Sequence, residues 1–244
     1  MDEDRLDRVL VKKYNIKSRE RAKTLITMGF VTVKGEKVTR PDFKISDSDN
    51  ICISKKDNPY VSRGGLKLEK ALEDFNIEVK GKICMDVGAS TGGFTDCLLE
   101  KGARKVYAVD VGYGQLDWKL RQDKRVVILE RTNIRYLSPD LIQDPIDMVT
   151  IDVSFISLEK VLPKVKEIIK NRGIIVALIK PQFEAGRKRV EKGGVVKDVR
   201  VHREVIKKIK SCGKRLELAV EGLITSPLKG PAGNIEYFIF FRNL

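Results

Sequence analysis

The chain has 244 residues, enough for one full-size α/β domain and a smaller one. Its 48 lysine and arginine residues outnumber 34 acidic residues and give a formal net charge of +14, which favours a polyanionic partner. Scattered cysteines and a single histidine exclude a zinc site, so no metal is expected. The lack of any run of ~18 apolar residues predicts a cytoplasmic protein without a membrane partner.

Residues 1–56 predict a small domain of two helices followed by short strands. Helical spacing of apolar residues over 6–14 predicts the first helix, and Ser18 is expected to cap a second helix that Gly29 ends. Alternation after Gly29 predicts strands joined by a turn at Lys34–Gly35. A run of cations is often only a solvated face, but here one side of a very small fold gathers several candidate RNA contacts, namely Lys12, Lys17, Arg19, Arg21 and Lys23.

The pattern RLDRVL…SRERAKTLITMGFVTVKGEKV resembles the small RNA-binding domain of ribosomal protein S-four. The resemblance covers about the first fifty residues. It implies that the two helices and the following hairpin grip structured RNA.

The remaining chain predicts a Rossmann-like α/β domain. Residues 57–80 form a patterned connector with a turn at Ser62–Gly65, where Arg63 is a further candidate RNA contact, and then a helix. Over residues 81–244 apolar strands alternate with helices, which is typical of a doubly wound, mostly parallel sheet. Seven strands are expected at 82–88, 105–112, 126–130, 146–154, 173–181, 216–226 and 236–242. Helices are expected at 94–102, 157–171 and 201–213, with His202 on a helix surface and the four cysteines as reduced core thiols.

The stretch DVGASTGGFTDCLL, residues 86–99, predicts a strand end, a glycine-rich turn and a helix. Asp110 ends the next strand and is placed to accept hydrogen bonds from ribose hydroxyls, which predicts a nucleoside-containing cofactor. The missing G-x-G-x-x-G pattern disfavours NAD and FAD, and the missing Gly-Lys-Ser/Thr excludes a P-loop. The candidate cofactor-binding residues are Asp86, Gly88, Ala89, Ser90, Gly92, Gly93, Asp110 and Asn133.

Charged residues follow or precede several predicted strands. Asp152 and Lys180 end the fourth and fifth strands, and Glu236 begins the last one. If the last strand is antiparallel, all three reach one rim of the sheet, and Lys67 lies close enough in the chain to join them. Each residue alone is explained as a helix cap, a turn residue or an exposed strand residue, but four charges converging near the cofactor indicate a site.

The motifs YVSRGGLKL, DVGASTGGFTDCLL, VDVGYGQL, TIDVSFISL, LIKPQFE and GNIEYF together resemble the TlyA or haemolysin A family. Members of this family are RNA 2′-O-methyltransferases with a catalytic domain of the FtsJ/RrmJ type. The resemblance implies S-adenosyl-L-methionine as cofactor and a ribose of ribosomal RNA, in cytidine, as substrate. It places the family's catalytic tetrad on Lys67, Asp152, Lys180 and Glu236.

Methyl transfer to a ribose hydroxyl needs positioning and a proton acceptor. We expect a neutral Lys180 to be the base, Asp152 to orient it, and Lys67 with Glu236 to hold the ribose and the base. The second lysine, the sulfonium and burial under RNA favour the neutral form of Lys180, whereas the two carboxylates oppose it.

The loop Pro181–Asp198 is expected to close over the RNA backbone through Arg187, Lys188 and Arg189, although a solvated loop explains its composition nearly as well. Two other functions stay open at this point. One is a binding-only protein on a methyltransferase scaffold, and the other is a membrane-lytic protein, for which no amphipathic or spanning segment is found. DNA is not expected as a partner, and the oligomeric state is not predicted.

Overall fold

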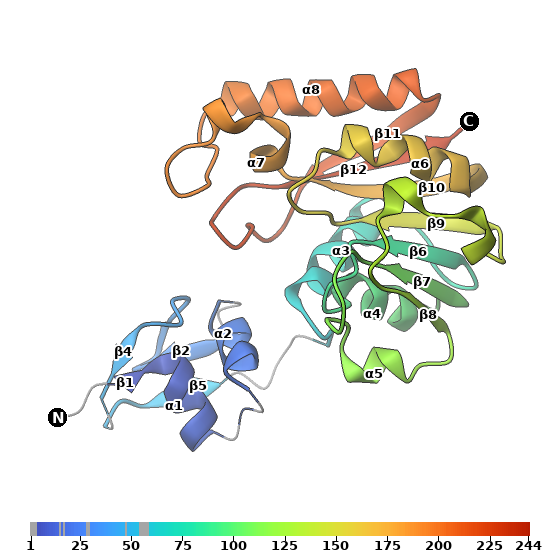
Figure 1. Cartoon of the computed structure of the whole chain (residues 1–244). Helices are drawn as coiled ribbons and strands as arrows, with labels where there is room; N and C mark the ends of the chain where they lie inside the picture. Colours follow the sequence, from blue (N-terminus) through green and yellow to red (C-terminus); the bar gives the residue numbers. More distant parts are fainter. Residues whose placement is uncertain (1–3, 15, 17, 28–29, 47, 54–58) are drawn as a thin grey trace. The chain divides into compact units, whose positions relative to one another are not determined.

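The computed structural model describes residues 4–14, 16, 18–27, 30–46, 48–53 and 59–244. The chain divides into two compact units, Met1–Arg63 and Gly64–Leu244 (Figure 1). The expected domain boundary at residues 56 and 57 lies outside the described residues. The connector helix, α3 (Arg63–Asp74), begins earlier than expected, so that Gly64 and Gly65 lie inside it instead of in a preceding turn.

The N-terminal unit packs two helices against short strands. Its elements are β1 (Asp4–Arg5), α1 (Leu6–Lys13), α2 (Arg19–Thr27), β2 (Val31–Val33), β3 (Glu36–Lys37), β4 (Lys44–Ile45) and β5 (Ile51–Ile53). Leu6 and Leu10 of α1 and Ile26 of α2 are completely buried in one apolar core with Val31 of β2. The predicted turn is confirmed: Lys34 and Gly35 both have positive φ and join β2 to β3 as a tight hairpin. Gly29 lies outside the described residues.

The C-terminal unit is built on a seven-stranded sheet in the order β11-β12-β10-β9-β6-β7-β8. The strands are β6 (Ile83–Val87), β7 (Lys105–Val109), β8 (Val126–Leu129), β9 (Ile146–Ile151), β10 (Ile169–Ile179), β11 (Leu218–Thr225) and β12 (Tyr237–Asn243). All seven predicted strands are confirmed, and β12 is antiparallel to both β10 and β11, as expected. The chain runs outward through β6, β7 and β8 and returns to β9 beside β6, so the topological switch point lies between β6 and β9.

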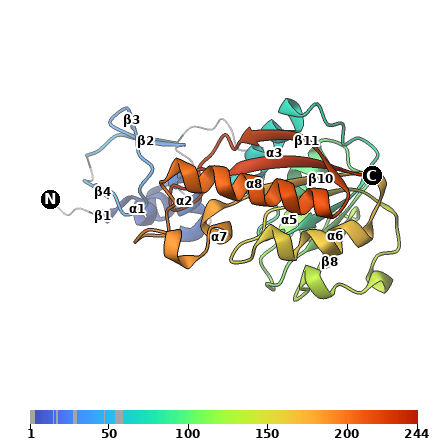
Figure 2. The same cartoon turned by 90° about the horizontal axis from the view of Figure 1, so that it is seen from above.

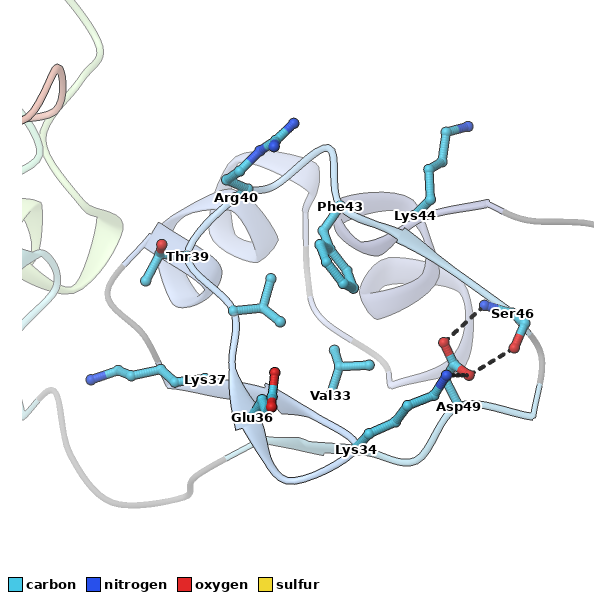
Figure 3. A pocket seen from close by; sticks show the side chains of 11 residues that line it. Val33, Lys34, Glu36, Lys37, Thr39, Arg40, Phe43, Lys44, Ser46 and Asp49 are labelled. Carbon is cyan, nitrogen blue, oxygen red and sulfur yellow. Dashed lines mark hydrogen bonds and ion pairs between the residues drawn. The ribbon is translucent and has the colours of Figure 1, made fainter.

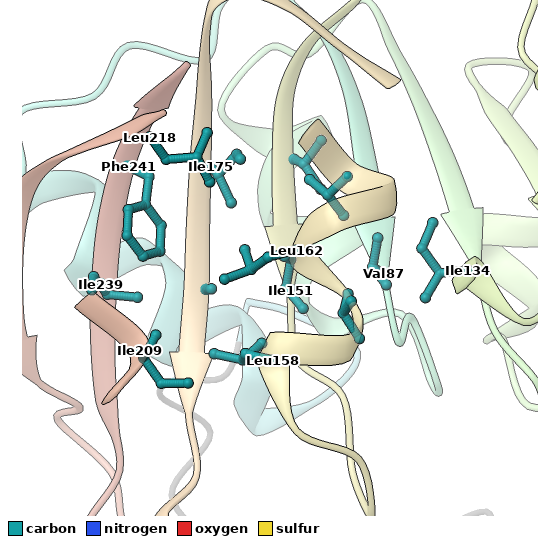
Figure 4. Packing of buried hydrophobic residues seen from close by; sticks show 14 of the residues in the cluster. Val87, Ile134, Ile151, Leu158, Leu162, Ile175, Ile209, Leu218, Ile239 and Phe241 are labelled. Carbon is teal, nitrogen blue, oxygen red and sulfur yellow. The ribbon is translucent and has the colours of Figure 1, made fainter. Parts of the chain in front are cut away.

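Helices cover both faces of this sheet (Figures 1 and 2). They are α4 (Gly93–Glu100), α5 (Trp118–Arg121), α6 (Leu162–Ile168), α7 (Pro181–Glu184) and α8 (Val199–Arg215), together with the short 3₁₀ turns η1 (Ile134–Tyr136), η2 (Pro139–Leu141), η3 (Leu158–Lys160) and η4 (Arg187–Arg189). Successive side chains of strand β12 point to opposite faces of the sheet. Ile239 and Phe241 belong to the core that α6 and α8 cover (Figure 4), whereas Phe238 contacts Phe94 of α4 on the other face.

The prediction of one helix over residues 157–171 is partly wrong. The structure divides it into η3 and α6, and from Ile169 the chain is already strand β10, paired with Ile146 of β9. The ladder is then interrupted and resumes at Ile174, with Arg172 at positive φ between the two. Strand pairing has therefore overridden a helical pattern at this end.

Two expectations about single side chains are also wrong. His202 is buried, not on a helix surface: its Nδ1 lies 2.9 Å from the Tyr237 hydroxyl and its Nε2 lies 2.8 Å from the Val196 carbonyl oxygen. Cys52 is exposed, because it points outward from β5, while the other three cysteines are buried. Among the described residues, none of the helices combines the length and the apolar character needed to cross a bilayer.

Candidate active site

Just beyond β6 the chain is hydrogen-bonded toward both neighbouring strands, β7 and β9. Gly88 donates its backbone N–H to the Val109 carbonyl at 2.8 Å, and Asp152 donates to the Val87 carbonyl at 2.9 Å. Gly88 has a φ of +86°, and a Cβ there would lie 2.6 Å from the Asp152 carbonyl oxygen. Only glycine permits this approach, which sets Asp152 beside the glycine-rich turn.

A cleft of about 740 Å³ opens at this point. Its lining includes four of the predicted cofactor residues, namely Gly88, Ser90, Asp110 and Asn133. The Asp110 carboxylate accepts hydrogen bonds from the backbone N–H groups of Ser90, at 2.8 Å, and Gly112, at 2.7 Å. Because each carboxylate oxygen can accept a second hydrogen bond, Asp110 can hold the turn and still bind a hydroxyl. The volume and this polar anchor suit a nucleoside.

The other predicted cofactor residues lie behind the cleft in the described part of the chain. Asp86 is fully buried and accepts hydrogen bonds from the hydroxyls of Thr95, at 2.7 Å, and Thr150, at 3.1 Å. Burial raises the pKa of the Asp86 carboxyl to about 7, although the two hydroxyls oppose the rise. Ala89, Gly92 and Gly93 shape the turn into α4 without lining the cleft. Their contact with a cofactor stays a prediction.

The four predicted catalytic residues form two ion pairs. Lys67 of α3 donates from Nζ to Glu236 Oε2 at 2.6 Å, and the two side chains are only 7% and 1% exposed. Lys180 Nζ lies 2.6 Å from Asp152 Oδ1 and donates to Ser154 Oγ at 3.0 Å. The structure thus pairs each lysine of the predicted tetrad with one of its carboxylates.

Strand register brings the two pairs to the same rim. The last paired residues of β10 and β12 are Ile179 and Tyr237, so Lys180 and Glu236 occupy facing positions one step beyond the ladder. The backbone carbonyl of Glu236 accepts the N–H of Ser226 at 2.8 Å, which extends the β11–β12 pairing by one step. The antiparallel last strand is what delivers Glu236 to the carboxyl ends of the parallel strands.

Three buried side-chain oxygens in the described part of the chain lack a hydrogen-bond partner: Asp152 Oδ1, Glu236 Oε1 and Gln182 Oε1. Asp152 Oδ1 is close to the Lys180 ammonium, but the angles do not suit a hydrogen bond. Buried polar atoms are normally paired, and unpaired ones call for a functional explanation. All three belong to the rim or to α7 beside it, so the rim carries oxygen atoms with unused capacity to accept hydrogen bonds. Gln182 lies within the motif LIKPQFE but was not a predicted site residue, because only its buried oxygen distinguishes it.

An exposed aromatic side chain stands at the edge of the cleft. Phe155 is 91% exposed and has a φ of +62°, a conformation that costs energy for a residue with a large side chain. Its ring lies 4.9 Å from that of Phe183, and the Lys180 ammonium is 5.9 Å from the Phe183 ring centre. Sequence patterns alone do not reveal this residue, because its significance rests on exposure and backbone strain.

The predicted RNA-binding residues are mostly at the surface. Lys12 and Arg19 are exposed and pair with Asp4 and with the buried Asp7, each at 3.0 Å. Lys17 and the side chain of Arg21 lie outside the described residues. The other five are Lys23 and Arg63, which are half-buried, and Arg187, Lys188 and Arg189, which form the exposed η4. Their contact with RNA stays a prediction.

The N-terminal unit also has a basic hollow of about 620 Å³ that the sequence motifs did not single out (Figure 3). Lys37, Arg40 and Lys44 lie around it, and Phe43 points into it. Lys34 is held at its edge by an ion pair with Asp49 at 2.9 Å. The hollow adds cations to a unit already expected to bind RNA.

Comparison with known proteins identifies both units. Residues 4–51 match the S4 domain, and residues 60–243 match the FtsJ-like methyltransferase family. The chain is 44% identical over 239 residues to the 16S/23S rRNA (cytidine-2′-O)-methyltransferase TlyA of Mycobacterium tuberculosis, covering 98% of this chain and 89% of that protein. It is 46% identical over 243 residues to Hemolysin A of Brachyspira hyodysenteriae, covering 97% and 99%.

A solved structure of a candidate hemolysin from Streptococcus thermophilus is similar over 100% of this chain and 89% of that chain, with a TM-score of 0.78 and 43% identity. Lys67, Asp152, Lys180 and Glu236 all lie within the segment that matches the methyltransferase family. The geometry of the sheet and these matches lead to one conclusion: the chain belongs to the FtsJ-like methyltransferase family and carries an N-terminal S4 domain.

Proposed function

We propose that the protein transfers a methyl group from S-adenosylmethionine to the 2′-hydroxyl of a cytidine in ribosomal RNA. The observation that carries the proposal is the pair of lysine–carboxylate contacts on one rim, beside a nucleoside-sized cleft. The name of the Mycobacterium tuberculosis relative supports the ribosomal substrate and the cytidine.

The cleft fits the cofactor at two points. Gly88, which lines the cleft, lets the Asp152 backbone lie against the glycine-rich turn, and Asp110 offers carboxylate lone pairs to ribose hydroxyls. When bound, S-adenosylmethionine supplies an electrophilic methyl group on a positively charged sulfur. The carboxylate of Asp152, which lines the same cleft, favours that positive charge.

Lys180 is the proposed acceptor for the proton of the attacking hydroxyl. Its ammonium is held between Asp152 and Ser154, so it must first lose a proton to act as a base. A bound sulfonium and the removal of water by RNA both favour the neutral amine. Lys67 is committed to Glu236 at 2.6 Å, and this pair holds Glu236 in its position opposite Lys180, with one Glu236 oxygen left without a hydrogen-bond partner.

Phe155 is suited to support the target base. Enzymes that modify a nucleotide within structured RNA take it out of the stack and hold the base against aromatic side chains. An exposed ring fixed beside Phe183, at the mouth of the cleft, provides such a surface. The S4 domain would then select the RNA site, because a single target nucleotide at the rim does not identify its place in the RNA.

The test is the Lys180→Arg variant, which keeps a positive charge but cannot give up its proton. Single-turnover methylation of ribosomal RNA should fall at least about 100-fold, while calorimetry shows unchanged cofactor binding. The matched control is Lys124→Arg, the same change at an exposed lysine that precedes β8 and does not line the cleft, which should methylate at the wild-type rate. Wild-type methylation by Lys180→Arg would refute the role of the base, and a wild-type protein that binds cofactor without methylating RNA would favour a binding-only protein.

A further inference from the structure

The outward face of α8 carries four exposed cations, Arg203, Lys207, Lys210 and Lys214, which we call the α8 cation row. At 3.6 residues per turn these positions fall within about 60° of arc and extend over about 16 Å. The side chains of Val205 and Ile209, on the opposite side of the helix, are buried against the sheet. The row is therefore a straight line of charge on the surface of the C-terminal unit.

The charges of the row are uncompensated. Within the described part of the chain, none of its four members has a carboxylate within ion-pair distance. The other cations of the same helix are paired with carboxylates. Lys208 lies 2.9 Å and Arg215 3.2 Å from Glu159, and Arg200 lies 3.0 Å from Asp198. Because neighbouring cations are neutralised by partners in the protein, the row stands out as charge left for a ligand.

A hollow of about 730 Å³ runs beside the row, between α8 and β11. Its floor is largely apolar and includes Ile206, Val220 and Leu223, and all members of the row line one wall. Glu217 is the one acidic residue among its described lining. Apolar surface of this kind supports the aliphatic stems of lysines while their ammonium groups stay in water.

We propose that the α8 cation row binds the phosphate backbone of the RNA substrate at a distance from the target nucleotide. The inference rests on the proposed function only in taking RNA as the ligand. A line of single charges matches a backbone that carries one charge per nucleotide, and a row about 16 Å long passes several successive phosphates. An acidic protein segment would use the apolar floor as well as the charges, and the experiment separates the two ligands.

The row begins near the catalytic rim and leads away from it. The N-terminal end of α8 follows the loop that starts at Lys180, and its C-terminal end precedes β11 at the opposite end of the sheet. RNA flanking a nucleotide bound at the rim can thus lie along α8 without crossing the cleft. The row would add affinity without taking part in the choice of base.

The test compares two triple variants that each remove three positive charges. The first carries Lys207→Gln, Lys210→Gln and Lys214→Gln in the row. The matched control carries Lys80→Gln, Arg104→Gln and Lys124→Gln, three exposed cations that precede β6, β7 and β8 at the far end of the sheet and have no ion-pair partner among the described residues. Binding to protein-free ribosomal RNA, and to poly-glutamate as an acidic polypeptide, is measured at several salt concentrations without cofactor.

The row variant should bind at least tenfold more weakly at low salt. Its plot of log affinity against log salt should be shallower by about two, since each phosphate contact contributes roughly 0.7–0.9. The control should stay within twofold of wild type, and circular dichroism should show that both variants fold.

An equal loss of RNA affinity in the two variants would overturn the proposal, because only the net charge of the protein would then matter. Unchanged RNA binding by the row variant would also overturn it, and loss of binding to poly-glutamate alone would assign the row to an acidic protein. Failure of the proposed function would look different: the wild type would bind RNA with the expected salt dependence and form no 2′-O-methyl product.

Discussion

Replacing Asp86 by asparagine should change how the stability of the C-terminal unit depends on pH. The Asp86 carboxyl is fully buried, and burial, reinforced by the charge of Asp152, raises its pKa from 3.8 to about 7 despite hydrogen bonds from Thr95 and Thr150. A rise of about three units at about 1.4 kcal/mol each corresponds to about 4 kcal/mol. This energy is the cost of ionising the carboxyl inside the folded protein.

The sign of the pH dependence follows from the number of protons that the folded and the unfolded chain bind. Between about pH 4 and pH 7 the folded chain holds the Asp86 proton and the unfolded chain has released it, so this group's contribution to the free energy of unfolding decreases as the pH rises. Of the total, about 3 kcal/mol should be lost between pH 5 and pH 8. Asparagine resembles the protonated acid in shape and cannot ionise, and the threonine hydroxyls can reorient to accept from its amide.

Urea unfolding followed by circular dichroism, at both pH values, tests this. The wild type should lose about 3 kcal/mol more than Asp86→Asn between pH 5 and pH 8, because the contributions of all other groups cancel in the comparison. If the free energies of unfolding of the two proteins changed equally with pH, Asp86 would ionise normally and the reasoning would be refuted.

Two further predictions concern the rim. Lys67→Met should lower the free energy of unfolding by about 3–5 kcal/mol, because it leaves Glu236 buried and unpaired; adding Glu236→Met should recover most of that loss but not methyl transfer. Urea unfolding of the two variants measures this, and a fully stable Lys67→Met protein would contradict the pairing. Phe155→Ala should leave stability nearly unchanged but lower kcat/KM for ribosomal RNA about tenfold or more, as expected for the loss of one stacked base at about 1–3 kcal/mol. Trp118→Ala, which removes another exposed ring, is the control, and an equal loss there would argue against a stacking role.

The parallel sheet was predictable because its strands are apolar runs that end in charged or glycine residues. Residues 82–88 and 105–112 illustrate this, since each run contains one buried strand and ends in the residues that line the cleft. Ile169 illustrates a position where the prediction from sequence was wrong. Its spacing from Val165 is helical, but pairing with Ile146 of β9 draws it into a strand, and local periodicity does not contain that contact.

The site was predictable in its residue types and less so in its geometry. The motif around Gly88 and the position of Asp110 correctly indicated a cleft at the strand ends. Which carboxylate pairs with which lysine depends on long-range packing: Lys180 reaches Asp152 because β10 lies beside β9, and Lys67 reaches Glu236 from helix α3. Gln182 and Phe155 became visible only through burial and exposure, which no sequence motif encodes.

The buried contact between Lys67 and Glu236 joins positions 169 residues apart in the chain. Closing so long a loop is slow, and the strand that bears the carboxylate enters the sheet between β10 and β11 after both have been synthesised. During translation, therefore, the parallel strands and the cleft at their ends can assemble while the rim still lacks Glu236. A nascent chain would be able to form its cleft before it could do chemistry on RNA.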